Sequence, residues 1–281
     1  AGYPWLDVQA SGKTELAVAL AEALTGEVLS CDSMQVYRYM DIGSAKIKPE
    51  ETEGVPHHLI DVLDPEEEFN VVTFQKMCKK CMEEIYGRGH VPILTGGTGF
   101  YIQSVLYDID FTENAEDTSI RDRLEKEAEE KGAEYLHQKL QEVDPASAEA
   151  IHANNIKRVI RALEFYEQTG EKISLHNETE RQKESAYASC YFVLNDDREK
   201  LYERIDRRVD EMLAEGLVAE VEALKKRGCT RKLVSMQGLG YKEILAYLDG
   251  EYSLEEAVYR IKRDTRHFAK RQITWFKREK E

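Results

Sequence analysis

The stretch ASGKTELAVAL, residues 10–20, decides the fold. Its Gly12-Lys13-Thr14 triplet at the start of a helix is the second half of a Walker A phosphate-binding loop. In such a loop, N–H groups at the helix N-terminus hold phosphate oxygens, Lys13 neutralises charge and the Thr14 hydroxyl can bind Mg²⁺. The full pattern has glycine five residues before Gly12, where this chain has Asp7. The alternative is an ordinary helix start with Lys13 as a solvated surface charge.

The first part of the chain alternates short apolar runs with helical patterns, as parallel strands joined by crossover helices do. A strand is predicted at residues 27–30, after the helix 13–24, and another at 90–95, after a helix near 71–86. The pattern predicts an α/β fold, a P-loop NTPase-like parallel sheet flanked by helices.

Beyond the first strands the character of the sequence changes. Residues 112 to about 183 are mostly charged helix, and strand-like patterning returns only at 190–194. Two long helices are expected after it, at residues 198–227 and from 254 to about 280. We therefore predict a catalytic core from residues 1–111 and 187–281, interrupted by a helical insertion domain at 112–186.

Composition excludes several classes of protein. With 281 residues, 42% hydrophobic and 33% charged, the chain has the make-up of an ordinary globular protein of one or two domains. No apolar run approaches the roughly 18 residues of a membrane span, and no secretory signal pattern opens the sequence. We expect a cytoplasmic protein that does not enter membranes.

The charge distribution points to a localised contact with a polyanion. A net charge of −15 argues against a protein that coats nucleic acid non-specifically. From residue 259 to 281, however, nine Lys/Arg face three acids. This basic segment suggests a phosphate-contacting helix, and the alternative is a solvated amphipathic face.

The cysteines and a histidine pair give weak signals. Five scattered cysteines do not suggest a disulfide framework. The CxxC spacing of Cys78 and Cys81 falls on a single helical stripe without a nearby histidine, so a metal or redox role is not expected. No third ligand at suitable spacing follows His57 and His58, so we expect these histidines to be structural.

Two further motifs follow the predicted strands. Asp32 comes directly after the strand 27–30, and the loop GGTG at 96–99, with Thr98, follows the strand 90–95. Ligands of open α/β sheets bind at the carboxyl ends of the strands, where both motifs lie. The alternatives are a helix N-cap for Asp32 and a plain turn for the glycine loop.

Eight segments, spread in order over nearly the whole chain, together resemble the tRNA dimethylallyltransferase family. They are ASGKT (10–14), DSMQVYR (32–38), MDIGSAK (40–46), GVPHHLID (54–61), GGTG (96–99), RVIRALE (158–164), GYKE (240–243) and AKRQITWF (269–276). The chain departs from the family where Gly-Pro-Thr precedes ASGKT, because it has Asp7-Val8-Gln9 there.

The resemblance implies a reaction and a catalytic set. Dimethylallyl pyrophosphate would place its charged end on Ala10, Ser11, Gly12, Lys13 and Thr14. The N6 amine of the adenosine adjacent to the anticodon of tRNA, position 37, would attack the allylic carbon and release pyrophosphate. Asp32 would accept the proton, Lys13, Arg208 and a Mg²⁺ ion near Thr14 would stabilise the leaving group, and Thr98 would position the substrate. The alternative for Arg208 is an ordinary helical ion pair.

By the same resemblance, RNA contacts are expected in both parts of the chain, with tRNA held by its anticodon stem-loop and the enzyme acting as a monomer. The expected contacts are Asp32, Ser33, Met34, Gln35, Thr98, Arg121, Lys157, Arg158, Val159, Ile160, Arg161, Gln237, Gly238, Leu239, Gly240, Tyr241 and Lys242. The C-terminal basic helix, with Arg263, Arg266, Lys270 and Arg271, could add phosphate contacts.

Two other functions remain open on the sequence. A P-loop kinase of a small metabolite would use the same phosphate loop and the same acid after a strand, and would act without tRNA. A catalytically decayed tRNA-binding protein would explain Asp7, and its RNA binding would not depend on Asp32.

Overall fold

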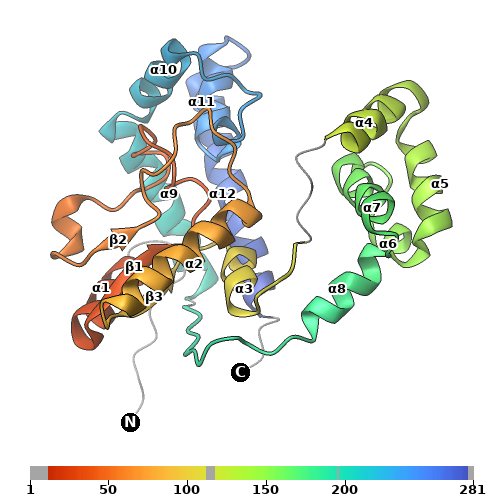
Figure 1. Ribbon diagram of the computed structural model, residues 1–281. Coiled ribbons are helices and arrows are strands. Elements are labelled where there is room, and N and C mark those ends of the chain that lie inside the picture. The colour runs from red at the N-terminus through yellow and green to blue at the C-terminus, as the bar shows by residue number, and fades with distance from the viewer. Residues whose placement is uncertain (1–11, 112–117, 195, 278–281) are drawn as a thin grey trace. The chain divides into compact units, whose positions relative to one another are not determined.

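The computed structural model describes residues 12–111, 118–194 and 196–277 (Figure 1). The chain divides into two compact units. One combines Ala1–Val105 with Ser189–Glu281, and the other is Leu106–Ala188. The first unit is therefore built from two chain segments that are distant in sequence.

A small parallel sheet forms the centre of the first unit. Its strands β1 (Gly26–Ser30), β2 (His57–His58) and β3 (Val91–Thr95) lie in the order β2-β1-β3, and both pairings are parallel. Every residue of β1 is buried, as expected for a central strand of a parallel sheet. The predicted strands at 27–30 and 90–95 are confirmed to within one residue.

Two helices cover this sheet. Both α1 (Gly12–Leu24) and α2 (Val71–Gly87) pack against β1 and β3 (Figure 1). Small residues of α1, Ala17 and Ala21 among them, pack on Val28 and let the helix approach the strand closely. Asn70 caps α2 by accepting the N–H groups of the second and third helical residues. The predicted α/β fold with a helix-flanked parallel sheet is confirmed.

The other regular elements of the first unit in the described residues are helices. They are η1 (Pro49–Thr52), α3 (Gly99–Leu106), α9 (Arg198–Glu215), α10 (Leu217–Arg227), η2 (Ser235–Gln237), α11 (Tyr241–Leu248) and α12 (Leu254–Phe276). The helix expected at 198–227 is broken in two at Gly216, whose φ of 111° is accessible mainly to glycine. Leu201 and Ile205 of α9 pack on Ala269 of α12.

The prediction of a strand at residues 190–194 is wrong. These residues form no regular element, and the side chain of Phe192 is 66% exposed. Aromatic and β-branched residues favour a strand only where a neighbouring strand and a packed face are available.

The second unit is entirely helical in its described residues. It contains α4 (Ser119–Lys131), α5 (Ala133–Val143), α6 (Pro145–Ala150), α7 (Ile156–Thr169) and α8 (Ile173–Arg181). Leu124, Leu136, Leu140 and Leu163 form its core. The buried carboxylate of Asp144 accepts hydrogen bonds from both N–H and hydroxyl of Ser147 and of Ser174, which ties α6 to α8. Across the described ranges, no helix is long and apolar enough to cross a membrane.

Candidate active site

Asp32 lies just beyond the carboxyl end of β1, and its side chain is fixed by a local turn. Oδ1 accepts the backbone N–H of Met34 at 2.7 Å and of Gln35 at 3.2 Å. No helix begins here, so the expected alternative of a helix N-cap is replaced by an Asx-type turn. The turn fixes the carboxylate at the ligand-binding edge of the sheet.

The glycine loop 96–99 lies against the same strand end. Cys31 N–H donates to Thr95 O at 2.7 Å, and Thr98 N–H donates to Cys31 O at 3.4 Å. A Cβ atom on Gly96 would lie 2.3 Å from Cys31 O, closer than any side chain tolerates. Glycine at 96 therefore lets Thr98 come beside the backbone that carries Asp32, and the segment is more than a plain turn.

Two cations complete this site. Burial lowers the pKa of Lys13 to about 8, while the charge of Asp32 raises it and that of Arg208 lowers it. Burial also lowers the pKa of Arg208, and Asp32 is among the acids that oppose this shift. Lys13, Asp32 and Arg208, which come from α1, the end of β1 and α9, thus lie close enough to act on one another electrostatically.

Part of the expected phosphate loop lies outside the described residues, namely Asp7, Ala10 and Ser11. Gly12 begins α1, and Lys13 and Thr14 stand in its first turn. A Cβ atom on Gly97 would lie 3.6 Å from Nζ of Lys13, so the ammonium group reaches the glycine loop. Lys13 is therefore partly buried beside the loop and is not a freely solvated surface charge.

The donor set fits a magnesium ion that arrives with a phosphate ligand. The Thr14 side chain is exposed at the helix start, and no group of three or more His, Cys, Asp or Glu within the described chain could hold a metal by itself. Mg²⁺ is usually bound by one or two protein oxygens together with substrate phosphates and water. Thr14 can supply one such oxygen.

The segments 32–35 and 237–242 lie together. A Cβ atom on Gly238 would lie 2.4 Å from Cε of Met34, so the two segments expected to contact RNA touch one another there. Not every side chain in them faces outward. Gln35 accepts from Ser30 Oγ and donates to the carbonyls of Ser44 and Ala45.

Tyr241 is buried, and it contacts Glu220, a residue that the sequence did not single out. Its hydroxyl donates to Glu220, which accepts three consecutive N–H groups of residues 41–43 as well. Gln272 of α12, whose amide donates to Gly97 O at 2.6 Å, was missed too. An acid in a charged helix and an amide in a basic helix carry no sequence signal that separates them from solvated neighbours.

The second unit places the other predicted RNA contacts on different faces of α7 and α4. Lys157 and Arg158 are exposed. Arg121 and Arg161 both approach the buried carboxylate of Glu164. Val159 and Ile160 lie in the hydrophobic core of this unit. The expectation that their side chains contact RNA is therefore corrected, because buried aliphatic groups stabilise the helix from inside.

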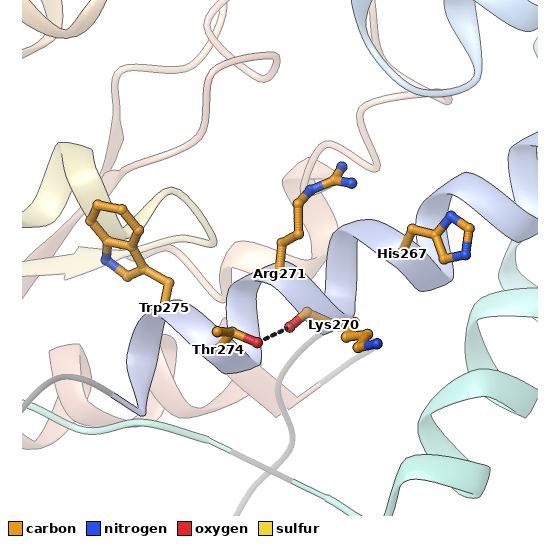
Figure 2. Close-up of a pocket in the computed structure, with 5 residues that line it drawn as sticks. All are labelled: His267, Lys270, Arg271, Thr274 and Trp275. Atoms are coloured by element: carbon orange, nitrogen blue, oxygen red, sulfur yellow. Dashed lines mark hydrogen bonds between the residues drawn. The ribbon is translucent and has the colours of Figure 1, made fainter. Parts of the chain in front are cut away.

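The basic residues of α12 fall into two groups, one in ion pairs with acids and one exposed near the end of the helix. Arg263 is paired with Asp264 and Arg266 with Asp206. Lys270 and Arg271 are exposed near the end of the helix. They line a surface hollow of about 500 Å³, shown in Figure 2, together with His267, Thr274 and Trp275.

The side chains of the histidine pair bond to other groups of the protein, and the first cysteine of the CxxC segment is buried. His58 Nε2 lies 2.6 Å from Glu27 Oε2, and His57 Nδ1 lies 2.9 Å from Val55 O. Cys78 is buried on α2, and burial raises its pKa to about 12. A thiol with so high a pKa is a poor nucleophile and a poor metal ligand.

Comparison with known proteins gives consistent matches over the chain. A model of the family described as IPP transferase matches residues 35–279. The tRNA dimethylallyltransferase of Lachnoclostridium phytofermentans is 63% identical over 272 residues, covering 97% of this chain and 87% of the relative. That of Acetivibrio thermocellus is 53% identical over 269 residues, covering 96% and 86%.

Solved structures agree with these sequence matches. The tRNA isopentenylpyrophosphate transferase of Bacillus halodurans is 46% identical, with a TM-score of 0.71 over 98% of this chain and 86% of that one. A eukaryotic dimethylallyltransferase acting on tRNA is 32% identical, with a TM-score of 0.82 over 96% of this chain and 68% of that one. The helix that starts the predicted phosphate loop and the acid at the strand end agree with sequence and structure matches that cover nearly the whole chain. The chain therefore belongs to the IPP transferase family.

Proposed function

We propose that this chain transfers a dimethylallyl group from dimethylallyl pyrophosphate to N6 of adenosine 37, next to the anticodon of tRNA, and releases pyrophosphate. The observation that carries the proposal is that Lys13 and Asp32 lie beside the loop of Thr98 and that Arg208 lies close enough to act on both electrostatically. Two cations and one carboxylate are the groups that this substitution requires. Membership in the family and the names of the close relatives support the same reaction.

Asp32 is the proposed general base. The lone pair of an adenine N6 amine is delocalised into the ring, so the amine becomes a competent nucleophile only if its proton is accepted as the C–N bond forms. The turn with Met34 and Gln35 holds Oδ1 through two N–H groups. No hydrogen bond within the described chain involves Oδ2, which leaves this oxygen to accept the proton. General bases of this kind contribute about 10²–10⁴-fold to the rate.

Lys13 and Arg208 are the proposed partners of the leaving group. As the allylic C–O bond breaks, its electrons pass to the pyrophosphate, whose added negative charge is stabilised by cations already in place. Burial lowers the pKa of both side chains, so an incoming pyrophosphate meets cations that are poorly solvated and bind it strongly. Mg²⁺, held at Thr14 when bound, would add charge neutralisation. Thr98 would orient the reacting groups.

The proposed RNA contacts fall into two groups. Around the site, the exposed parts of segments 32–35 and 237–242 would receive the adenine, which must be splayed out of its stack to be reached. In the second unit, Arg121, Lys157, Arg158 and Arg161 would contact the backbone of the anticodon stem-loop. The exposed Lys270 and Arg271 would add phosphate contacts.

We further propose that the chain acts as a monomer in the cytoplasm, where its tRNA substrate is processed. Lys13, Asp32, Thr98 and Arg208 all come from one chain, so no partner subunit is required to complete the site. Sedimentation equilibrium of the active protein tests this part directly.

The reaction is tested by transfer of labelled dimethylallyl to unmodified tRNA with Mg²⁺, using this chain, Asp32→Ala and Asp7→Gly. Label that reaches tRNA with the first and is lost with Asp32→Ala supports the reaction and its base. Label from Asp7→Gly alone means that the aspartate in the phosphate loop weakens pyrophosphate binding. Phosphorylation of a small metabolite from ATP without tRNA favours the kinase instead. Binding of tRNA that is indifferent to Asp32, without transfer, favours a decayed enzyme.

A further inference from the structure

Gln272 joins the end of α12 to the glycine loop. Its side chain is only 6% exposed, and its Nε2 donates a 2.6 Å hydrogen bond to Gly97 O across 175 residues of sequence. A Cβ atom on Gly97 would lie 2.3 Å from that nitrogen. The amide therefore packs directly on the loop backbone, at a place where any side chain on residue 97 would displace it.

The bond fixes the orientation of one peptide unit. The carbonyl of Gly97 and the N–H of Thr98 belong to the same planar, trans peptide, so they point in opposite directions. Gln272 holds the carbonyl on one side, and Cys31 O accepts the N–H on the other at 3.4 Å. Rotation of this peptide would break both hydrogen bonds, and a buried amide without a partner costs about 1–3 kcal/mol.

The two hydrogen bonds of the Gly97–Thr98 peptide lie next to groups of the proposed reaction. Cys31 immediately precedes Asp32, and Thr98 is the residue whose N–H is held. The Cβ position of Gly97 lies 2.3 Å from Gln272 Nε2 and 3.6 Å from Lys13 Nζ. The orientation of one peptide thus bears on the proposed base, the substrate-positioning threonine and the phosphate-binding lysine.

We propose that Gln272 is a positioning residue for prenyl transfer: it locks the Gly97–Thr98 peptide and so sets Thr98 against Asp32 and Lys13. The inference rests on the proposed function for its kinetic consequence. Its structural part, that the amide of Gln272 restrains Thr98, holds independently of which reaction the site performs.

The kinetic test compares Gln272→Met with Ile261→Val. Methionine keeps the length of the side chain but has no N–H donor. Ile261 is a buried residue of α12 far along the helix from Gln272, so its truncation lowers stability without touching the loop. We expect Gln272→Met to lower kcat about 10-fold while KM for both substrates stays within about twofold, and Ile261→Val to keep both parameters.

The structural test is amide hydrogen exchange at Thr98 in the same proteins. Exchange of this N–H is expected to be about 10-fold faster in Gln272→Met and unchanged in Ile261→Val. Unchanged exchange, or an unchanged kcat in an active enzyme, overturns the positioning role. A rise of KM alone would place Gln272 in direct contact with substrate and also overturn it. If the unaltered chain transfers no prenyl group, the proposed function fails, and the exchange result alone decides whether Gln272 holds the loop.

Discussion

The hydroxyl of Tyr241 donates a 2.7 Å hydrogen bond to Oε1 of Glu220, and the same carboxylate accepts the N–H groups of residues 41–43 at 2.8–3.1 Å. Burial and the neighbouring carboxylate raise the pKa of Tyr241, so the phenol stays a donor at every ordinary pH. One side chain of α10 thereby joins the start of α11 to the loop that follows the Asp32 segment.

Replacing Glu220 by alanine is expected to destabilise the protein by about 3 kcal/mol, because hydrogen bonds to a charged acceptor contribute about 1.5–3 kcal/mol each and several donors lose their partner at once. Urea denaturation measures the change. Glu222→Ala on the same helix is the control. Glu222 pairs with Lys226 on the exposed face of the helix, and such pairs contribute about 0–1 kcal/mol. Equal effects of the two substitutions would contradict the role given to Glu220.

Asp32→Asn is expected to lower prenyl transfer at least about 100-fold with the fold retained. An asparagine oxygen can still accept the N–H groups of Met34 and Gln35, whereas the amide cannot accept a proton. Labelled transfer to tRNA gives the rate, and circular dichroism reports the fold. Asp249→Asn, which removes a surface acid paired with Lys225 and Arg231, should transfer normally. Activity of Asp32→Asn near that of this control would exclude Asp32 as the base.

Glu27 gives a stability that depends on pH. Its buried carboxylate pairs with Arg88, His58 and His90, and these hydrogen bonds, led by that of Arg88, lower its pKa from 4.5 to about 2. A folded-state pKa below the unfolded one contributes stability that is complete above pH about 4.5 and is lost as the pH falls toward 2.

The expected contribution at neutral pH is on the order of 3 kcal/mol. We therefore expect the stability difference between the unaltered chain and Glu27→Gln, measured by urea denaturation, to shrink steadily below pH 4.5. Glu83→Gln, an exposed acid of α2, should differ little from the unaltered chain at any pH. A difference for Glu27→Gln that is constant with pH would mean that folding does not lower the pKa of this carboxyl group.

Gly96→Ala is expected to lower the free energy of unfolding by more than about 2 kcal/mol and to reduce activity, because the added methyl group would meet three backbone atoms of Cys31 at 2.3–2.9 Å. Gly87→Ala is the matched control. Gly87 closes α2, and no atom lies within 4 Å of its Cβ position, so alanine should stabilise the helix by roughly 0.5–1 kcal/mol. Thermal unfolding separates the two. A neutral Gly96→Ala would mean that the loop is free to move away from β1.

Local pattern was sufficient for β1 and β3, although the short strand β2 was not predicted. The strands at 27–30 and 90–95 could be predicted because each is a short apolar run between a helix and a motif with its own chemistry. Asp32 and Thr98 could be placed at one edge because parallel strands end at the same edge. Helix periodicity also predicted α2 to within one residue.

Contacts between segments that are distant in sequence could not be predicted from local sequence patterns. Residues 190–194 have side chains that favour strands, but no strand lies beside them in the described chain. Their strand propensity alone therefore gave a wrong prediction. Glu220 and Gln272 have charged, solvated neighbours in sequence. Their partners lie some 175 residues away in the chain. Val159 and Ile160 were carried along with their basic neighbours, although helical periodicity turns them to the opposite face.

The span between Gly97 and Gln272 has a consequence during synthesis. At roughly 5–20 residues per second, a ribosome needs roughly 9–35 s to proceed from one to the other. Throughout that interval the nascent chain can form β1 and β3 but lacks the amide that holds the loop between them and α12. The loop at Gly97 therefore gains this restraint only after residue 272 has been synthesised and α12 has docked.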